Sequence, residues 1–436
     1  MPSFRWRLLI LGIAALSIRL FYIFVIAPEP VGVGGDASFY HSAANLIAQG
    51  VFYDRALVVG HAAHVYPTAL HPPLFSMLLS VVALAGGVHL LPQRIAGCLV
   101  GCCSVVLLAL LGRRVAGERA GTIAGTVAVV YPPFVTADGS IQAEPLYLLL
   151  VVIALLLAWA LVDAPTVKRA IALGAVIGLA ALTRTEGVFL LALLAWPAAW
   201  GPVQGRWARL LGATVACAIV LTPWVIRNAV IFHKLELSAN YVTVISAANC
   251  PDTYYGHDIG WWSADCLAHA RTVQQFHVGD ASPTPGLHYI RRHPARAALV
   301  AVVRVARTFG FYQPLRIGNS EARRQWFDAF GLVLLYPLLV LAVIGAIRLS
   351  ARRWLLLAPL WTTLIVTATG WGNARFRIGA DVSIVLLAAA AVGGAHWQTR
   401  WRVSSRSGGV GSPSGAEVHG FMPPREDERC DTDQHV

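Results

Sequence analysis

An aspartate beside two glycines, just after the first apolar run, is the residue whose type and position best suit catalysis in this sequence. Asp36 follows Gly34 and Gly35, and Tyr40 and His41 come shortly after it. A carboxylate directly outside a membrane segment can accept a proton from a substrate hydroxyl. Taken alone, Asp36 fits a turn residue after a glycine pair better than a catalytic residue, so its role depends on what the rest of the chain places beside it.

The composition indicates a membrane protein. Of the 436 residues, 57% are hydrophobic and only 13% are charged, whereas soluble domains carry about 25% charged residues. Backbone polar groups in hydrocarbon must be satisfied within their own segment, which favours helices. The apolar runs are continuous and do not alternate, which argues against barrel strands. We therefore expect an all-α, polytopic transmembrane helical bundle.

About ten apolar runs are long enough to cross a bilayer, and two further segments, 72–91 and 293–312, are ambiguous. The sequence thus predicts about 10–12 spans. The ten runs cover approximately 8–27, 93–112, 119–137, 144–162, 169–184, 186–201, 207–227, 328–347, 354–371 and 378–396.

The short basic loops indicate whether the two ambiguous segments cross the membrane, because cytoplasmic loops are enriched in lysine and arginine. Arg5 and Arg7 place the N-terminus in the cytoplasm, and the later basic loops share that side only if neither ambiguous segment crosses. We therefore interpret 72–91 as re-entrant or interfacial. We interpret 293–312 as an amphipathic interfacial helix with its arginines at headgroup level.

The predicted organisation is one transmembrane domain over 1–403, with both termini cytoplasmic and two long outer loops at 28–92 and 228–327. The Ser-, Gly- and Pro-rich segment 404–436 is predicted to be a disordered cytoplasmic tail.

This topology collects polar side chains on the outer side of the membrane. Ionisable groups at membrane depth are costly, so such a collection suggests a functional site. Transfer from an anionic lipid carrier to a hydroxyl needs a carboxylate that takes the proton and arginines that hold the phosphate. The collected residues are Asp36, Tyr40, His41, His71, Asp138, Glu144, Arg184, Glu186, Arg227, Asn228, Asn373, Arg375 and Arg377.

Two cysteines, Cys250 and Cys266, lie in one predicted outer loop, where a disulfide between them is plausible in an oxidising compartment. The histidines His61, His64 and His71 have a poor spacing for zinc, and no CxxC pattern occurs. The sequence therefore indicates no cofactor; a divalent metal is not indicated, and metal dependence stays open.

Five stretches in order resemble the bacterial membrane glycosyltransferases of the GT-C superfold, in the dolichyl-phosphate-mannose-protein mannosyltransferase-like group (glycosyltransferase family 39 and relatives). The resemblance runs over about residues 5–396. The stretches are GDASFYHSAANLIAQG at 35–50, HPPLFSMLL at 71–79, AEPLYLLL at 143–150, LTPWVIRNAVIFHKLELSAN at 221–240 and GNARFRIGADVSIVLLAAAAV at 372–392.

The resemblance implies roles for individual residues. Asp36 matches the aspartate proposed as catalytic base, and His71 begins the element near the lipid phosphate. Arg375 and Arg377 match an element near the donor pocket, while Arg184 lies in a turn, TRTEG, in which relatives have proline in place of Thr185. The donor phosphate would then meet Arg375, Arg377, Arg184 and His71.

Five further residues of the collection are expected to bind the acceptor or the sugar: Tyr40, His41, Glu144, Glu186 and Asn228. Many relatives have an acidic pair in the first outer loop, but Ala37 follows Asp36 here. This departure argues against a second carboxylate, or a metal bridged by two carboxylates, at that position.

The predicted function is transfer of a hexosyl or pentosyl unit from a polyprenyl-phosphate donor to an acceptor hydroxyl, with inversion, on the extracytoplasmic face of the cell membrane. The acceptor is a glycan, a lipid or a protein, and no nucleic acid partner is expected. No Rossmann fingerprint or P-loop occurs, which disfavours a soluble nucleotide-sugar donor. The alternatives are a secondary transporter or lipid-linked sugar flippase, whose site would lie near the bilayer midplane, and a non-catalytic scaffold.

Overall fold

The computed structural model describes residues 3–28, 35–59, 62–266, 283–314, 324–349 and 352–394. Six helices in these ranges are long and apolar enough to cross a membrane, which confirms the predicted polytopic helical bundle. They are α1 (Phe4–Phe21, continued by a π turn Tyr22–Ile26), α4 (Leu90–Val130), α6 (Glu144–Asp163), α9 (Arg206–Phe232), α15 (Gln325–Arg348) and α17 (Ile378–Gly393, entered through the 3-10 turn η6, Ala374–Arg377).

Helix α4 is broken at Ala116 and Gly117, so that the label α4 covers two consecutive helical segments, here called its two legs. Gly117 has a φ of 90°, a conformation that glycine adopts without the steric cost of a Cβ atom. The legs correspond to the predicted runs 93–112 and 119–137. The second leg leads into the short α5 (Pro132–Gly139), which begins with two prolines.

Shorter helices fill the other predicted runs. Helix α7 spans Val167–Ala181 and α16 spans Arg353–Thr369. Between α7 and α9 the chain forms a 3-10 turn η2 (Thr185–Val188), a π turn η3 (Leu191–Ala195) and the short α8 (Trp196–Ala199).

The ambiguous segment 72–91 contains a short helix, α3 (Leu74–Leu84). Its 11 residues extend about 16 Å at 1.5 Å per residue, which is about half of the hydrocarbon thickness. It is too short to cross as a single helix, while its re-entrant or interfacial placement stays a prediction. Helix α3 packs on α2 (Gly35–Ala48) around buried Phe39, Tyr40 and Phe75.

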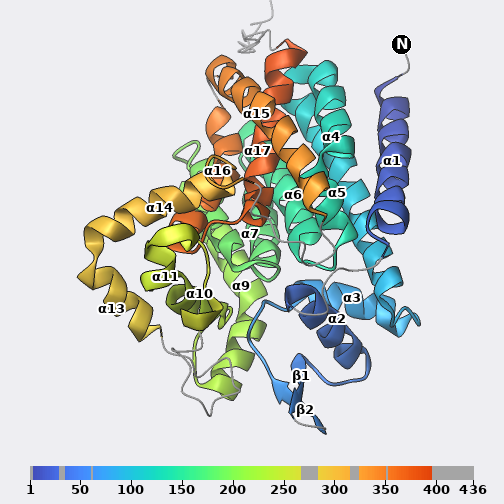
Figure 1. Cartoon of the computed structure of the whole chain (residues 1–436). Helices are drawn as coiled ribbons and strands as arrows, with labels where there is room; N and C mark the ends of the chain where they lie inside the picture. The colour runs from blue at the N-terminus through green and yellow to red at the C-terminus, as the bar shows by residue number, and fades with distance from the viewer. Residues whose placement is uncertain are drawn as a thin grey trace, which may run out of the picture. The chain divides into compact units, whose positions relative to one another are not determined.

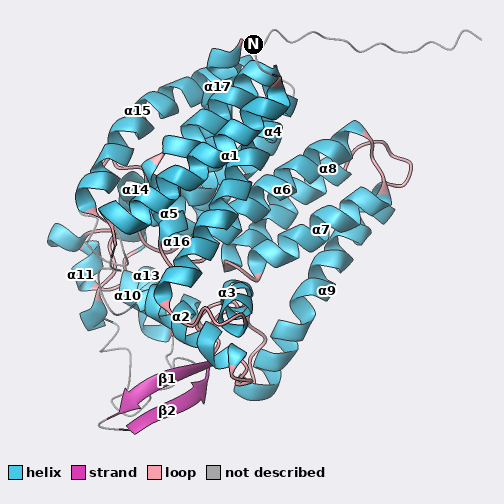
Figure 2. Ribbon diagram, turned by 90° about the vertical axis from the view of Figure 1, so that its right-hand side faces the viewer, coloured by secondary structure: helices cyan, strands magenta, loops and turns pink. Residues whose placement is uncertain are grey.

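A β-hairpin between α2 and α3 departs from the all-α prediction. Strand β1 (Asp54–Val59) pairs antiparallel with β2 (Ala62–Pro67), in a register that opposes Asp54 to Pro67 and Val59 to Ala62. Arg227 of α9 holds its base by donating to the carbonyl oxygens of Thr68 (2.7 Å) and Tyr53 (3.0 Å). In Figures 1 and 2, α2, α3 and the hairpin lie beyond one end of α4 and α6, here called the site end.

The second ambiguous segment forms α14 (Pro294–Thr308), which follows α13 (Thr284–Arg292). Arg304 and Arg307 of α14 are 3% and 4% exposed, so their side chains are buried within the protein. Their placement at headgroup level stays a prediction. Arg304 donates to the carbonyl oxygen of Ala248, the last residue of α10 (Asn240–Ala248). Carbonyl groups at a helix end lack partners within the helix, and the two arginines supply donors to this neighbouring segment.

The Arg304 guanidinium stays charged although it is buried. Burial lowers the pKa of Arg304 to about 10, which is still far above neutral pH. Arg307 donates to the carbonyl oxygens of Ile259 (2.6 Å) and His257 (3.1 Å). Helix α14 therefore holds the segment 248–259 through these two arginines, and Arg304 also donates to the carbonyl oxygen of Ala368 in α16.

Glycines allow two helix pairs to approach closely, as is common between membrane helices. A Cβ atom on Gly174 of α7 would overlap the carbonyl oxygen of Ala213 in α9. One on Gly345 of α15 would overlap the carbonyl oxygen of Leu387 in α17. Both crossings therefore depend on the missing side chain.

We expect Gly174→Ala and Gly345→Ala each to destabilise the fold by about 1–3 kcal/mol through overpacking. The midpoint of thermal unfolding of the purified protein in detergent measures this. Gly12→Ala in α1 is the matched control, since its Cβ would lie 3.6 Å from Val106 Cγ2, at ordinary contact distance. Equal midpoints for all three variants would contradict the prediction.

Candidate active site

Five polar residues from distant parts of the sequence meet at the site end of the helices. Asp36 lies in the first turn of α2, and His71 lies just before α3. Glu144 is the first residue of α6, Arg184 precedes η2, and Arg375 lies in η6. The predicted gathering of these residues is therefore what the structure shows, although their chemical roles stay predictions.

Local sequence places the two carboxylates at helix starts. Gly35 has a φ of 71°, a left-handed conformation that lets the chain enter α2 one residue before Asp36. Pro145 directly after Glu144 suits the first turn of α6. The partial positive charge of a helix N-terminus stabilises a carboxylate in the first turn, so both Asp36 and Glu144 are favoured as anions.

The five residues, with Glu186, form one continuous row of charges. Asp36 Oδ1 lies 3.1 Å from His71 Nε2, and Asp36 Oδ2 accepts from Arg375 Nη2 at 2.7 Å. Arg375 Nε donates to Glu144 Oε1, which also accepts from Arg184 Nη1 at 2.7 Å. Arg184 Nε donates to Glu186 Oε1.

The row runs from a reachable end to a buried centre. The side chain of Asp36 is 29% exposed, those of Arg375 and Arg184 are 11% exposed, and that of Glu144 is 1% exposed. The Arg184 guanidinium also lies over the ring of Phe376, 5.5 Å from its centroid. Asp36 is therefore the carboxylate that a substrate reaches most easily, and Glu144 lies beneath the arginines.

The environment of Asp36 keeps it ionised. Burial acts to raise the pKa of Asp36, but the charge of Arg375 and the His71 ring together outweigh burial and hold that pKa well below its ordinary value. The carboxylate of Glu144 also acts on Asp36 electrostatically. At neutral pH, Asp36 is an anion engaged with a cation.

Other predicted site residues have partners outside the row. The ring of His41 points to α4, with Nδ1 2.9 Å from Gln93 Oε1. Asn228 donates to the carbonyl oxygen of Glu236 at 2.9 Å. Tyr40 is buried and packs against the ring of His71 at a centroid distance of 5.2 Å, so it supports a member of the row.

Arg377 is close in sequence to Arg375 but is fully engaged elsewhere. It donates to Asp381 Oδ1 at 2.8 Å and to the carbonyl oxygen of Thr308 at 2.9 Å, and its residue is 2% exposed. The spacing of Arg377 and Asp381 by four residues is the sequence signal that could have predicted this helical pair. The two arginines line one cavity of about 20 Å³ together with Glu144, Asp328 and Asp381, large enough for about one water molecule.

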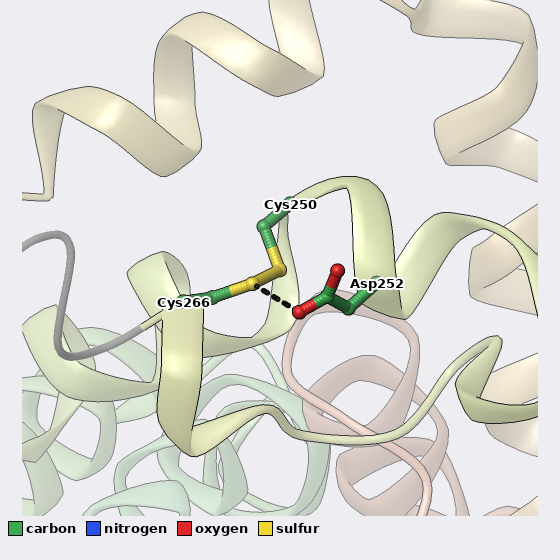
Figure 3. Close-up of side chains that lie close together, drawn as sticks. All are labelled: Cys250, Asp252 and Cys266. Atoms are coloured by element: carbon green, nitrogen blue, oxygen red, sulfur yellow. Dashed lines mark hydrogen bonds between the residues drawn. A yellow bond between two sulfur atoms is a disulfide. The ribbon is translucent and has the colours of Figure 1, made fainter.

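Cys250 and Cys266 form a disulfide beside Asp252 (Figure 3). The Asp252 Oδ2 atom lies 3.4 Å from Cys266 Sγ. Among the described residues, these three side chains bring possible metal-ligand atoms within 4.8 Å of one another. Zinc binds cysteine as a thiolate, so sulfurs bonded to each other do not form such a site.

We expect Arg377→Gln to destabilise the fold by about 3–5 kcal/mol, because it leaves the buried Asp381 carboxylate without its cation. Arg375→Gln should cost less, since Asp36 keeps His71 and Glu144 keeps Arg184. Thermal unfolding of the two variants in detergent measures the difference. A larger loss for Arg375→Gln would show that the assignment of the two arginines is reversed.

The sequence and the fold are similar to known membrane transferases. Residues 70–226 match the model of the dolichyl-phosphate-mannose-protein mannosyltransferase family, whereas no curated protein sequence gives a significant match. The matched range contains His71, Glu144, Arg184 and Glu186 and leaves out Asp36 and Arg375.

Two solved structures of similar fold are archaeal oligosaccharyltransferases from Archaeoglobus fulgidus. The first is AglB in complex with an inhibitory peptide and a dolichol-phosphate, with a TM-score of 0.53 and 14% identity over 89% of this chain and 50% of that chain. The second is an apo form, with a TM-score of 0.50 and 16% identity over the same shares. The chain thus spans about half the length of these proteins.

ArnT from Cupriavidus metallidurans bound to undecaprenyl phosphate has a TM-score of 0.43 and 16% identity, over 87% of this chain and 77% of that chain. Together with the family model, the structural similarity confirms the predicted resemblance to GT-C membrane glycosyltransferases of the mannosyltransferase-like group.

Proposed function

We propose that this GT-C membrane protein transfers a monosaccharide from a polyprenyl-phosphate donor to an acceptor hydroxyl. The observation that carries the proposal is the direct pairing of a reachable carboxylate, Asp36, with an arginine, Arg375, where the helices end. A carboxylate and a phosphate-binding cation in one site suit this reaction, because the carboxylate takes the acceptor proton and the cation stabilises the leaving phosphate.

The donor would lie with its isoprenoid tail among the membrane helices and its phosphate at Arg375 and Arg184. Arginine suits this role because its planar donors match phosphate oxygens in pairs. The archaeal structure of similar fold contains a dolichol-phosphate, which is a lipid of this class. His71 is the third group placed near the phosphate, through its contact with Asp36.

The proposed step is a single displacement. The acceptor oxygen gives its proton to Asp36 and attacks the anomeric carbon, while the bond from that carbon to the phosphate oxygen breaks. Its electron pair leaves with the polyprenyl phosphate, whose charge the two guanidinium groups stabilise. One displacement inverts the anomeric configuration. The step as proposed uses no metal ion, because the arginines supply the positive charge.

The supporting residues surround this centre. Glu144 and Glu186 orient the arginines through their carboxylates, and Tyr40 supports His71. We place the site on the extracytoplasmic face with both termini in the cytoplasm, on the strength of the basic loops. Analysis of the reaction products would identify the sugar as a hexose or a pentose. It would also identify the acceptor as a glycan, a lipid or a protein.

Asp36→Asn should reduce transfer by about 10²–10⁴-fold, because the amide cannot take the acceptor proton. Membranes containing the protein, supplied with labelled polyprenyl-phosphate sugars and with extracted envelope acceptors, provide the measurement. Product stereochemistry by NMR tests inversion.

Asp54→Asn is the matched control, since Asp54 lies at the start of β1 and Asp54 Oδ1 is 4.0 Å from Arg227 Nη2. This variant should transfer at nearly the wild-type rate. Undiminished transfer by Asp36→Asn would refute the role of Asp36 as base. Movement of a lipid-linked sugar across the membrane without a glycosidic product would favour the flippase alternative.

A further inference from the structure

Resting on the proposed function, we propose that Arg375 blocks Asp36 until the donor phosphate takes over the guanidinium. The base would then become available only when the donor is bound. Glu144 would be the positioning residue that holds Arg375 in place during this exchange. The donor must accordingly bind before the acceptor reacts.

Both oxygens of Asp36 are engaged in the structure. Oδ2 accepts from Arg375 Nη2 at 2.7 Å, and Oδ1 lies 3.1 Å from His71 Nε2. A carboxylate held in this way is a poor proton acceptor, because the proton would have to compete with two donors for the same charge. An acceptor hydroxyl that arrives first therefore meets a neutralised base.

Arg375 binds its two carboxylates through different nitrogens. Nε donates to Glu144 Oε1, and Nη2 donates to Asp36 Oδ2. The contact to the buried Glu144 fixes the inner edge of the guanidinium, while the contact to Asp36 lies on the more exposed side. A phosphate can replace Asp36 at Nη2 without removing the arginine from Glu144.

Glu144 is built to hold both arginines at once. A single oxygen, Oε1, accepts from Arg375 and from Arg184, and the residue is 0% exposed. This placement under the arginines differs from the acceptor-binding role predicted for Glu144. It spaces two guanidinium groups around one anion, and a phosphate bound to both would meet a prepared pair of donors.

Donor binding makes the electrostatic environment of Asp36 more negative. Four charged or titratable groups that act on Asp36 are Arg375, His71, Glu144 and Tyr40. Arrival of a phosphate both withdraws the positive charge of Arg375 and adds a negative charge nearby. Each change raises the pKa of Asp36 toward the working pH, where a general base is most effective.

The test compares two pH profiles of the wild-type protein in proteoliposomes. The acid limb of kcat/KM for the donor reports the free enzyme, and that of kcat at saturating donor and acceptor reports the loaded enzyme. We expect the limb of kcat to lie about 1–3 pH units higher, the usual size of an aspartate–arginine interaction. The probe is a synthetic polyprenyl-phosphate sugar that the transfer assay has shown to be used.

Two variants test the part played by Glu144. Glu144→Gln should raise KM for the donor by at least tenfold, with a smaller effect on kcat, and should bring the two limbs closer together. Glu144→Asp should restore part of the separation. Glu186→Gln is the matched control, because Glu186 contacts Arg184, whereas Glu144 contacts both Arg184 and Arg375. It should leave the separation of the limbs unchanged, whatever it does to the rate.

The outcomes separate this inference from the proposed function. Transfer with coincident acid limbs would overturn the inference and leave the transferase assignment standing. The same holds if Glu144→Gln lowers the folded fraction alone and the remaining folded protein keeps the wild-type KM and separation of limbs. Absence of transfer from every polyprenyl-phosphate sugar by the folded protein would overturn the proposed function itself.

Discussion

The ion pair between Asp36 and Arg375 joins the beginning and the end of the membrane domain. Placing charges at membrane depth is costly unless they are paired, and here each charge has partners from other elements. Asp36 in α2 contacts η6, and η6 contacts the start of α6 through Glu144. Glu144 in turn holds the turn after α7 through Arg184. The positions of four helix ends thus depend on one row of charges.

The helices could be predicted from sequence because hydropathy along a span is a local property. The break in α4 was also visible, since a basic segment separates its two apolar legs. The hairpin and the buried arginines of α14 were not predictable in the same way. The hairpin base depends on Arg227, far away in sequence, and Arg304 is buried only because α10 and α16 bring carbonyl groups to it. Such partners exist only in the folded chain.

The sequence could predict that the polar residues of the site lie close together, but not which of them form ion pairs with each other. The predicted topology put the polar helix ends on one side of the membrane. In the structure these ends meet, and they bring together Asp36, His71, Glu144, Arg184 and Arg375. The topology could not separate Arg375 from Arg377. The 3-10 turn η6 directs these neighbours to different partners, because Asp381 in the first turn of α17 takes Arg377. Individual hydrogen bonds follow from backbone geometry over a few residues, which composition and charge do not specify.

The same geometry weighs against a transporter. A transporter site would lie near the midplane, between broken helices that open in turn to each side. The charged row lies instead at helix starts, with Glu144 opening α6 and Arg375 just before α17. The turn that bears Arg375 is also fixed from outside the membrane helices. The Gly372 amide donates to the Gly260 carbonyl oxygen at 2.9 Å, and Trp371 packs edge to face on Trp261. These contacts tie the turn that bears Arg375 to the segment around Gly260 and Trp261, which suits a site that keeps one geometry.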